Sequence, residues 1–219
     1  SDRVIEYAKD RCNLITFGSH ESDTVSCQHV EKRSDGLYFT VSSLKYNGEF
    51  SITMPGLFNI SNALAAMAIC MVLDVPEEYV RSGLRKARAA GRMQIYESRD
   101  KNVTVIVDYA HNQLSFRSLF SSVKRAFPAS PVIALFGAAG GKAQERREQL
   151  PREAAPYSDL MIFANEDPAH EDPMKVCREL AEHVPDDTPN KIILDREAAV
   201  HAAFKAAREE YVNPDAPTI

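Results

Sequence analysis

The chain has 219 residues, of which 44% are hydrophobic and 26% are charged, and its formal net charge is −5. This balance is typical of a soluble globular protein with one large domain or two smaller ones. An acidic surface attracts neither nucleic acid nor an anionic membrane, so we expect no partner of either kind. No apolar run reaches membrane-spanning length, and the first residues contain no apolar signal region.

The cysteines are far apart and form no C-x-x-C pair or zinc-like spacing; they are Cys12, Cys27, Cys70 and Cys177. Isolated thiols of this kind fit a reducing compartment, so we expect a cytoplasmic protein. Cys70 and Cys177 fall within apolar helical stretches, and we expect both in the core.

Residues 1–54 are predicted to be rich in strands. Residues 13–17 form an apolar run closed by Gly18, which indicates a buried strand. Residues 36–41 and 49–53 alternate apolar and polar side chains on either side of Asn47-Gly48, a strong hairpin signal. We therefore expect a half-exposed antiparallel sheet without catalytic residues.

A buried helix is predicted next, because residues 63–73 are apolar almost all round. Ser61 or Asn62 is its candidate N-cap. On chemistry alone, the favoured interpretation of Asn59 and Asn62 is capping and turn formation. A second helix follows Pro76, with acidic residues in its first turn and basic residues near its end.

The segment Ala89–Arg92 breaks that helix, and strands and helices alternate regularly after it. We therefore place a domain boundary and hinge near residue 91. The pattern predicts strands at 103–108, 131–136, 160–164 and 191–195 and helices at 113–127, 144–156, 173–183 and 196–210. Pro151 inside the second of these helices implies a kink or two short helices. The predicted fold is α/β, with a Rossmann-like, mostly parallel sheet and helices on both faces.

Three strands of this sheet run directly into polar loops, which are Asp108–Asn112, Gly137–Lys142 and residues 164–173. Open parallel sheets bind ligands outside the carboxyl ends of their strands. These loops therefore predict a crevice for a nucleotide or another small molecule.

The first two loops allow more than one interpretation. Small residues in Gly137–Lys142 could cradle a phosphate, although a tight turn explains them equally well. It is not a Walker A loop, because Ala143 follows Lys142 where that motif needs Ser or Thr. Asp108 could accept hydrogen bonds from ribose hydroxyls and His111 could contact a base or phosphate. Alternatively, Asp108 merely caps helix 113–127.

The third loop contains the acidic segment Glu166–Asp172. Pro168 and Pro173 make it an extended loop, and Asp172 is expected to cap the next helix, so we predict no metal site here. A cluster of carboxylates is better suited to recognising an amine. No nucleophile elbow, catalytic triad or G-x-G-x-x-G motif is present, so we assign no catalytic residue.

Five motifs occur in the order typical of one family; they are Gly56–Ala66, Gly91–Met93, Val107–His111, Phe136–Gly140 and Asp167–Pro173. Together they resemble the Mur ligases, and most closely the UDP-N-acetylmuramoyl-tripeptide synthetase (MurE) type. The resemblance covers essentially the whole chain, and five ordered motifs are more specific than any one alone. It implies a three-domain enzyme that uses ATP and Mg²⁺ to form an amide bond through an acyl phosphate.

The resemblance also implies roles for individual residues. In the nucleotide site, it places Asn59 and Asn62 near the adenine, Arg92 on the phosphates, Asp108 on the ribose and His111 along the wall. Facing the incoming amino acid, it places Lys142, Glu166, Asp167, Pro168 and Ala169.

This sequence departs from the family pattern at the amino-acid site. Members that add meso-diaminopimelate carry D-N-P-R, whereas Glu166-Asp-Pro-Ala169 stands here without the arginine. Alanine resembles the lysine-adding branch, and the acidic Glu166 and Asp167 suit an ε-ammonium group. Lys142 stands where an arginine is usual. We therefore expect L-lysine; the alternatives are a ligase for diaminopimelate or another amino acid, a folylpolyglutamate synthetase, or an inactive Mur-like binding module.

The resemblance also predicts that the chain is a fragment. Residues 1–91 would be the C-terminal part of the central ATP-binding domain, and 92–219 the C-terminal domain without its last segment. The family's P-loop, Mg²⁺ ligands and carbamylated lysine would precede this chain, and its G-K-G-H-E segment would follow Ile219. We therefore expect no catalytic or metal-binding residue here, and no activity from this chain alone. The expected partners are ATP, the UDP-N-acetylmuramoyl dipeptide (UDP-MurNAc-dipeptide) and an amino acid, bound by a monomer.

Overall fold

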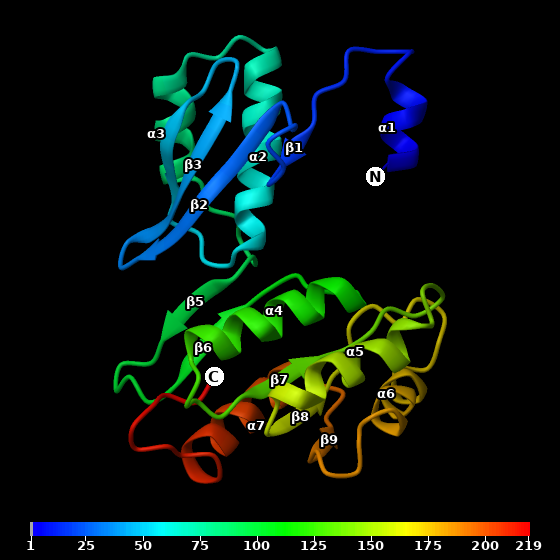
Figure 1. Ribbon diagram of the computed structural model, residues 1–219. Helices are drawn as coiled ribbons and strands as arrows, with labels where there is room; N and C mark the ends of the chain where they lie inside the picture. The colour runs from blue at the N-terminus through cyan, green and yellow to red at the C-terminus, as the bar shows by residue number, and fades with distance from the viewer. Residues whose placement is uncertain (1) are drawn as a thin grey trace. The chain divides into compact units, whose positions relative to one another are not determined.

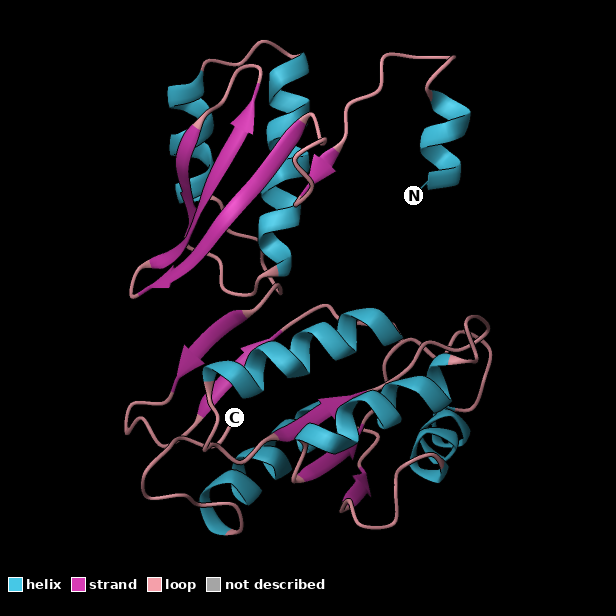
Figure 2. Ribbon diagram, viewed as in Figure 1, coloured by secondary structure: helices cyan, strands magenta, loops and turns pink. Residues whose placement is uncertain are grey.

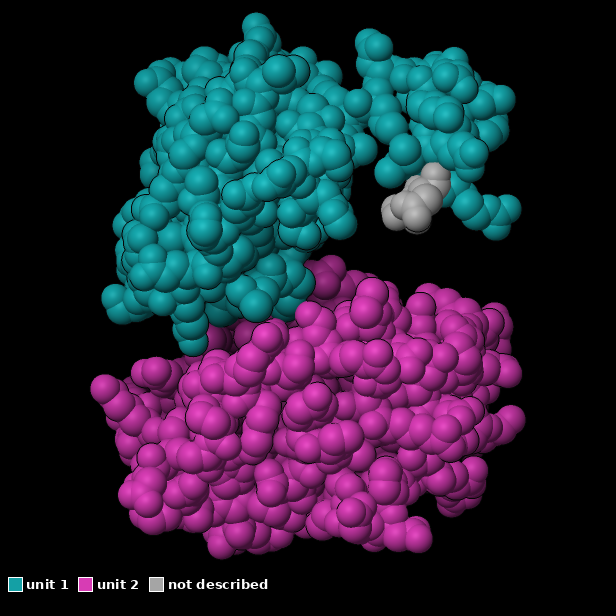
Figure 3. Space-filling model, in the orientation of Figure 1, with its two compact units in different colours: residues 1–89 teal, residues 90–219 magenta. Residues whose placement is uncertain are grey.

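The computed structural model describes residues 2–219. The chain divides into two compact units, residues 1–89 and residues 90–219, which are coloured separately in Figure 3. Among the described residues, no helix is both long and apolar enough to cross a membrane. Each unit has its own sheet and its own core, and each is described by itself.

Unit 1 is a four-stranded sheet covered by two helices (Figures 1 and 2). The strands are β1 (Phe17–Gly18), β2 (Val25–Arg33), β3 (Gly36–Ser43) and β4 (Gly48–Ile52), and the helices on the sheet are α2 (Phe58–Val72) and α3 (Glu77–Lys86). β2, β3 and β4 are antiparallel, whereas β1 is parallel to β2. Side chains of β3 are buried alternately, because every second residue faces the helices.

The hairpin of β3 and β4 confirms the predicted antiparallel pairing, but not the turn. Val41 pairs with Gly48, so six residues form the connection instead of a tight Asn-Gly turn. Asn47 closes this loop: its Oδ1 accepts from the Ser43 backbone N–H at 3.2 Å, and its Nδ2 donates to the Ser43 carbonyl at 2.9 Å. Gly48 lies in the first position of β4 at φ +93°, a conformation that favours glycine.

The N-terminal segment differs from the prediction. Helix α1 (Asp2–Ala8) was not expected, and the predicted strand 13–17 is reduced to the two residues of β1. The residues before β1 form no regular strand. The backbone N–H of Thr16 donates to the Thr24 hydroxyl at 3.2 Å, and the backbone N–H of Thr24 donates to the Thr16 hydroxyl at 3.0 Å. Side chains of this kind compete with regular strand pairing.

Helix α2 begins at Phe58, so the predicted N-cap role of Ser61 or Asn62 is wrong. Both residues lie inside the helix, and Leu57 precedes its first turn without a side-chain cap. Burial on most sides is also wrong for the last turns of this helix. Ile69 and Val72 are 61% and 65% exposed. Helix α3, by contrast, agrees with the prediction.

Unit 2 contains the parallel α/β arrangement that was predicted. Its parallel sheet consists of β7 (Ile133–Phe136), β8 (Leu160–Phe163) and β9 (Asn190–Ile192). Its helices are α4 (Gln113–Ala126), α5 (Arg146–Ala154), α6 (Pro173–Glu182) and α7 (Arg196–Glu209). Helix α5 continues through Pro151 and ends in the short 3₁₀ turn η1 (Ala155–Tyr157).

Helices cover both faces of this sheet (Figure 2). Ala199 and Ala206 of α7 pack against the face of β8 that carries Leu160 and Ile162. On the opposite face, Phe136 contacts Phe116 of α4 and Phe163 of β8 edge to face, with ring centroids 5.0 and 5.2 Å apart. β8 is buried along its whole length, as expected of a central parallel strand. Of the two thiols expected in the core, Cys177 is buried and Cys70 is only partly so.

β6 (Thr104–Val107) belongs to this unit but bonds to different neighbours. It pairs in antiparallel fashion with β5 (Gln94–Glu97), a strand that was not predicted. The chain's last residues connect β6 to β7. Thr218 forms a parallel bridge with Val103, and Ile219 exchanges hydrogen bonds of 2.8 and 2.7 Å with Pro131 and Ile133. β6 therefore runs parallel to β7, with Thr218 and Ile219 between their first residues.

Candidate functional site

The polar loops that follow β6, β7 and β8 form two groups in unit 2. The first group surrounds Asp108, at the end of β6. The second consists of the loop after β7 and the loop after β8, which are hydrogen-bonded to each other. All three loops follow the carboxyl ends of strands that run in one direction, where α/β sheets bind ligands.

Asp108 holds backbone groups on both sides of it. Its Oδ2 accepts from the backbone N–H of Met93 and its Oδ1 from that of Ala110, each at 2.7 Å. The interpretation of Asp108 as a helix cap is wrong, because Asn112 caps α4 in a capping box with Ser115. A carboxylate oxygen can accept more than one hydrogen bond, so Asp108 retains capacity for a ligand hydroxyl.

A cation and two aromatic rings lie beside Asp108. The Arg92 guanidinium lies 4.8 Å from the centroid of the Tyr109 ring, and the Tyr109 ring lies 5.0 Å from that of His111. Nδ1 of His111 donates to the Tyr109 carbonyl at 2.9 Å, since a carbonyl oxygen can only accept. Nε2 therefore remains available to a ligand. Arg92 and Tyr109 are exposed, so this group presents a positive charge and an aromatic surface to solvent.

Asn59 and Asn62 lie on α2, in unit 1, one helical turn apart. Asn59 is 3% exposed and donates through Nδ2 to the Pro55 carbonyl at 2.7 Å. Its Oδ1 accepts from Asn62 Nδ2 at 3.1 Å. Asn59 thus anchors the turn before the helix and orients Asn62, whose side chain is exposed.

The loops after β7 and β8 are joined at three points. The Gly140 backbone N–H donates to the Asp167 carbonyl, and the Gly141 N–H donates to Oε1 of Glu171, each at 2.7 Å. A Cβ on Gly140 would lie 1.9 Å from the Pro168 carbonyl oxygen, so only glycine permits this approach. The loop first interpreted as a possible phosphate cradle therefore uses N–H groups to hold its neighbour.

The predicted amino-acid contacts surround this junction. Lys142, Glu166, Asp167 and Ala169 are exposed, and Pro168 is partly buried against Gly140. Ala169 has φ +51°, and its Cβ lies 3.5 Å from the position that a Cβ on Gly141 would take. Asp172 caps α6 by accepting from the Met174 N–H at 3.0 Å, which confirms the predicted cap.

Arg147 lies beneath the two loops and is 4% exposed. Its guanidinium binds Glu171 in a bidentate pair, at 2.6 and 2.9 Å, and also contacts Glu179 of α6. The bond from Arg147, with a second from the Gly141 N–H, lowers the pKa of Glu171 to about 2. The same bond from Glu171 raises the pKa of Arg147 above its ordinary value. Both groups are therefore charged at neutral pH.

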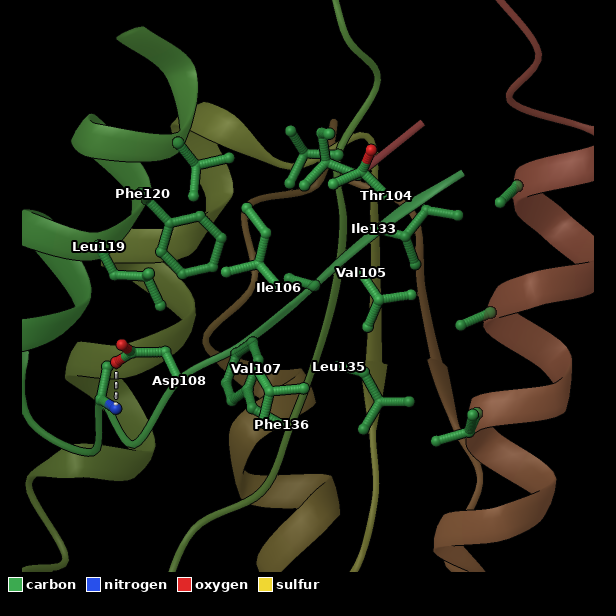
Figure 4. Close-up of a pocket in the computed structure, with 18 of the residues that line it drawn as sticks. Thr104, Val105, Ile106, Val107, Asp108, Leu119, Phe120, Ile133, Leu135 and Phe136 are labelled. Carbon is green, nitrogen blue, oxygen red and sulfur yellow. Dashed lines mark hydrogen bonds between the residues drawn. The ribbon is translucent and has the colours of Figure 1, made fainter. Parts of the chain in front are cut away.

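A cavity of about 430 Å³ lies between β6 and β7 (Figure 4). Its walls are mainly apolar and come from Val105, Ile106, Leu135 and other residues of the two strands, with α4 and α7 on either side. Ile219 lies at one end, and Asp108 lines it as well. The predicted amino-acid-binding residues do not line this cavity, so it is distinct from the polar junction of the two loops.

The structure therefore brings together two subsets of the predicted residues within unit 2. Arg92, Asp108 and His111 form the first subset, and Lys142 and residues 166–169 the second. Asn59 and Asn62 belong to unit 1. Within residues 2–219, no group of three His, Cys, Asp or Glu side chains is arranged to hold a metal ion. The ligand roles of all these residues stay predictions.

Two sequence families match consecutive parts of the chain. The Mur ligase middle domain matches residues 1–70. The glutamate ligase domain of the Mur ligases matches residues 91–212, which is more than half of the chain. The chain belongs to the Mur ligase family. The resemblance predicted from the five motifs is therefore confirmed.

Relatives of this Mur ligase chain include ligases named for L-lysine and ligases named for 2,6-diaminopimelate. It is 33% identical over 193 residues to the UDP-N-acetylmuramoyl-L-alanyl-D-glutamate–L-lysine ligase of Enterococcus faecalis, covering 86% of this chain and 38% of the relative. It is 28% identical over 199 residues to the corresponding 2,6-diaminopimelate ligase of Clostridioides difficile, covering 90% of this chain and 41% of the relative. The chain thus spans about two fifths of the length of the curated relatives it matches.

The Mur ligase fold is also visible in three dimensions. Folylpolyglutamate synthase of Mycobacterium tuberculosis, solved with ADP and AMPPCP, superimposes with a TM-score of 0.74 at 18% identity, covering 95% of this chain and 47% of that one. Identity this low establishes the fold alone. The predicted fold class is thereby confirmed.

Sequence reasoning missed Arg147 and Tyr109 in this Mur ligase chain. Arg147 could have been found from its position. It precedes Leu150 by three residues and Ala154 by seven, so it lies on the buried face of the predicted helix 144–156. A charged residue there requires a charged partner. Tyr109 lies between Asp108 and His111 in a short loop. Nothing in the sequence indicated that its ring would contact Arg92.

Proposed function

We propose that this chain is part of an ATP-dependent ligase that adds an amino acid, preferably L-lysine, to UDP-N-acetylmuramoyl-L-alanyl-D-glutamate for peptidoglycan precursor synthesis. Residues 1–91 would be the C-terminal part of the central ATP-binding domain, and 92–219 most of the C-terminal domain. When bound, ATP and Mg²⁺ would activate the substrate carboxylate as an acyl phosphate, which the amine of the amino acid attacks. Family membership and the names of the relatives support this reaction class.

The Asp108 group suits the nucleotide. Arg92 supplies an exposed cation for phosphate, and Tyr109 fixes its direction by stacking. Asp108 keeps acceptor capacity for a ribose hydroxyl while its backbone contacts hold the loop. His111 presents Nε2 to a ligand. Family membership supports a contact of Asn62 with the adenine. We assign no residue of this chain to Mg²⁺.

The junction of the two loops suits the incoming amino acid. Carboxylates bind ammonium groups through charge-assisted hydrogen bonds, and Glu166 and Asp167 are exposed there. Ala169 supplies no cation for a distal carboxylate. The observation that carries the preference for lysine is this combination of two exposed carboxylates with a short, neutral side chain at residue 169. Lys142, beside them, would contact the α-carboxylate of the amino acid.

The proposed reaction is tested by amino-acid-dependent phosphate release from the full-length protein with UDP-MurNAc-dipeptide and ATP. We expect L-lysine to support release about tenfold more efficiently than meso-diaminopimelate, because an arginine that could pair with the second carboxylate is absent. Equal rates with the two amino acids would contradict the lysine assignment. Faster release with diaminopimelate would favour the diaminopimelate-adding alternative, and glutamate-dependent release with a folate in place of the dipeptide would favour a folylpolyglutamate synthetase.

Two related proposals concern the chain itself and its setting. We expect nucleotide binding without any phosphate release if the full-length protein is an inactive Mur-like binding module. The 219-residue chain alone should form no amide, and ATP-dependent product from it would show that the fragment assignment is wrong.

The four free cysteines support a cytoplasmic, reducing setting. A monomer is expected, and sedimentation equilibrium of the full-length protein would test it.

A further inference from the structure

The two loops predicted to contact the amino acid meet at one partly buried ion pair, Arg147–Glu171. Glu171 is the meeting point. Its Oε1 accepts from the Gly141 N–H of the first loop, and both of its oxygens bind Arg147. Glu171 itself ends the second loop, just before the cap of α6. A single carboxylate therefore connects the loop after β7, the loop after β8 and the buried side chain of α5.

Backbone contacts also join the two loops. The Gly140 N–H donates to the Asp167 carbonyl, and the Gly140 backbone lies too close to Pro168 for any side chain to fit between them. Gly141, Ala143 and Ala169 all have positive φ, between +50° and +68°. For alanine this conformation is unfavourable and persists only where surrounding contacts enforce it. Of these three residues, Gly141 donates directly to Glu171, and the Cβ of Ala169 lies beside Gly141.

We infer that the Arg147–Glu171 pair is a positioning device that sets the placement of Lys142 and residues 166–169 and thereby the selection of the amino acid. Arg147 is buried, and both carboxylate oxygens of Glu171 are already bonded to Arg147, with Oε1 also bonded to Gly141, so we assign the pair a positioning role and no substrate contact. Arg147 acts through Glu171, and Glu171 acts through the two loops that it holds. This inference rests on the proposed function for the identity of the substrate.

The structure provides a matched control. Glu179 also binds Arg147, but it lies on α6 and forms no hydrogen bond to either loop. Glu171→Gln keeps the size and one acceptor of the side chain while removing the charge that Arg147 binds. Arg147→Lys keeps the charge but cannot form the bidentate pair. Glu179→Gln removes a comparable contact of Arg147 without touching the loops.

The test is steady-state kinetics of the full-length protein. We expect Glu171→Gln and Arg147→Lys to raise the KM for the amino acid about tenfold, because a small displacement of positioning groups has a large effect on binding. The KM for ATP and for UDP-MurNAc-dipeptide should not change, and Glu179→Gln should leave all three constants near wild type. A merely structural role would lower the active fraction and hence kcat, with an unchanged KM for the amino acid, and that result would overturn the inference.

Amide hydrogen exchange in the same full-length proteins separates this inference from the proposed function. Gly140 and Gly141 should be protected in the wild type and in Glu179→Gln, and should lose protection together in Glu171→Gln. Unchanged protection in Glu171→Gln would overturn the positioning role even if the enzyme is active. A wild type without amino-acid-dependent phosphate release would overturn the proposed function, and the selection of the amino acid with it, whatever the exchange data show.

Discussion

Asp108 and Met93 are joined by a hydrogen bond of 2.7 Å from the backbone N–H of Met93 to a carboxylate oxygen of Asp108. Met93 is buried and has φ +46°, a conformation that few residues other than glycine adopt without support. Arg92 directly precedes it, and Tyr109, on which the Arg92 guanidinium lies, directly follows Asp108. The carboxylate therefore fixes the position of the cation that we assign to the nucleotide phosphates.

Replacing Asp108 by asparagine tests two roles of this carboxylate, which are holding the backbone around it and supporting nucleotide binding. An amide offers one oxygen, so only one of the two N–H groups of Met93 and Ala110 keeps its acceptor. We expect the free energy of unfolding of unit 2 to fall by about 1–2 kcal/mol, as is typical when a buried donor loses its partner. Urea denaturation measures this. In the full-length protein, the Kd for ATP should rise, as determined by calorimetric titration.

The control for this substitution is Asp186→Asn, because Asp186 is an exposed carboxylate in the loop between α6 and β9. It changes the net charge by the same amount and should alter neither stability nor ATP affinity. If Asp108→Asn matched this control in both measurements, Asp108 would have neither role.

Asn59 and Asn62 should respond differently to alanine. Asn59 is buried and bonded to the Pro55 carbonyl, so Asn59→Ala should destabilise unit 1 by about 1–3 kcal/mol, because that carbonyl loses its partner. Asn62 is exposed but donates to the buried Oδ1 of Asn59, so Asn62→Ala should cost less than Asn59→Ala, about 0.5–1 kcal/mol. Thermal unfolding of both variants checks the difference.

The affinity of Asn62→Ala for ATP tests whether Asn62 also contacts the nucleotide. In the full-length protein, Asn62→Ala should weaken ATP binding although its stability falls less than that of Asn59→Ala. A large loss of stability in Asn62→Ala, with unchanged ATP affinity, would mean that Asn62 serves only the fold.

Much of unit 2 could be predicted because its signals are local. Short apolar runs and intervening helical patterns identified β6, β7 and β8, since a buried parallel strand is apolar along its whole length. The N-terminal segment was harder. Thr16 and Thr24 prevent a regular strand by bonding through their side chains, and no apolar pattern reveals this. The start of α2 was misplaced because no side chain caps it.

The candidate site was predictable loop by loop, but not as an arrangement. Asp108 and Glu166 follow strand ends, which the sequence shows directly. The bond between Gly141 and Glu171 joins residues thirty positions apart, and no local pattern encodes such a contact. Met93 illustrates the same limit, because its backbone conformation depends on a carboxylate fifteen residues away.

An arginine at residue 169 should move the amino-acid preference towards meso-diaminopimelate. Ala169 is exposed and already has a positive φ, so Ala169→Arg adds a cation beside the junction without changing the backbone conformation required. We expect the ratio of kcat/KM for diaminopimelate over lysine to rise about tenfold, the size of one charge-assisted pair. Amino-acid-dependent phosphate release by the full-length protein measures this ratio.

The neighbouring His170→Arg is the matched control, because it places the same charge at the next exposed position. It should leave the ratio near that of the wild type. The same shift in both variants would mean that added charge, and not the position of residue 169, determines the preference.

The Arg147–Glu171 pair should make the stability of unit 2 depend on pH in the acid range. Hydrogen bonds from Arg147 and Gly141 lower the pKa of Glu171 from an ordinary 4.5 to about 2. Because Glu171 holds its proton less tightly in the folded protein than in the unfolded chain, it contributes stability to the folded state. That contribution is fully present above pH 4.5 and is lost as the pH falls through about 2. Glu171→Gln lacks this contribution, so its Tm should lie below that of the wild type at pH 6 and approach it as the pH falls.

Thermal unfolding across that pH range tests this, with Glu182→Gln as the control. Glu182 is exposed at the end of α6, so Glu182→Gln removes one carboxylate without touching the Arg147–Glu171 pair. A difference in Tm between wild type and Glu171→Gln that stays constant from pH 6 to the acid limit would contradict the assigned ionisation.

Removal of Thr218 and Ile219 should loosen β6 from β7. Their backbone groups form hydrogen bonds with Asn102, Thr104, Pro131 and Ile133, each 2.7–3.0 Å long. At about 1 kcal/mol for each bond, we expect the free energy of unfolding of unit 2 to fall by about 4 kcal/mol. Amide exchange at Thr104 and Ile133 measures the local effect, since both N–H groups lose their acceptors.

Thr218→Val is the control for that truncation, because it removes only the hydroxyl that donates to the Tyr211 carbonyl. Its backbone pairing is unchanged, so Thr104 and Ile133 should stay protected even if the variant is less stable overall. Equal exchange at these two amides in the truncated and wild-type chains would mean that the last residues do not hold β6 beside β7. The cavity between the strands would then have to be maintained by α4 and α7 alone.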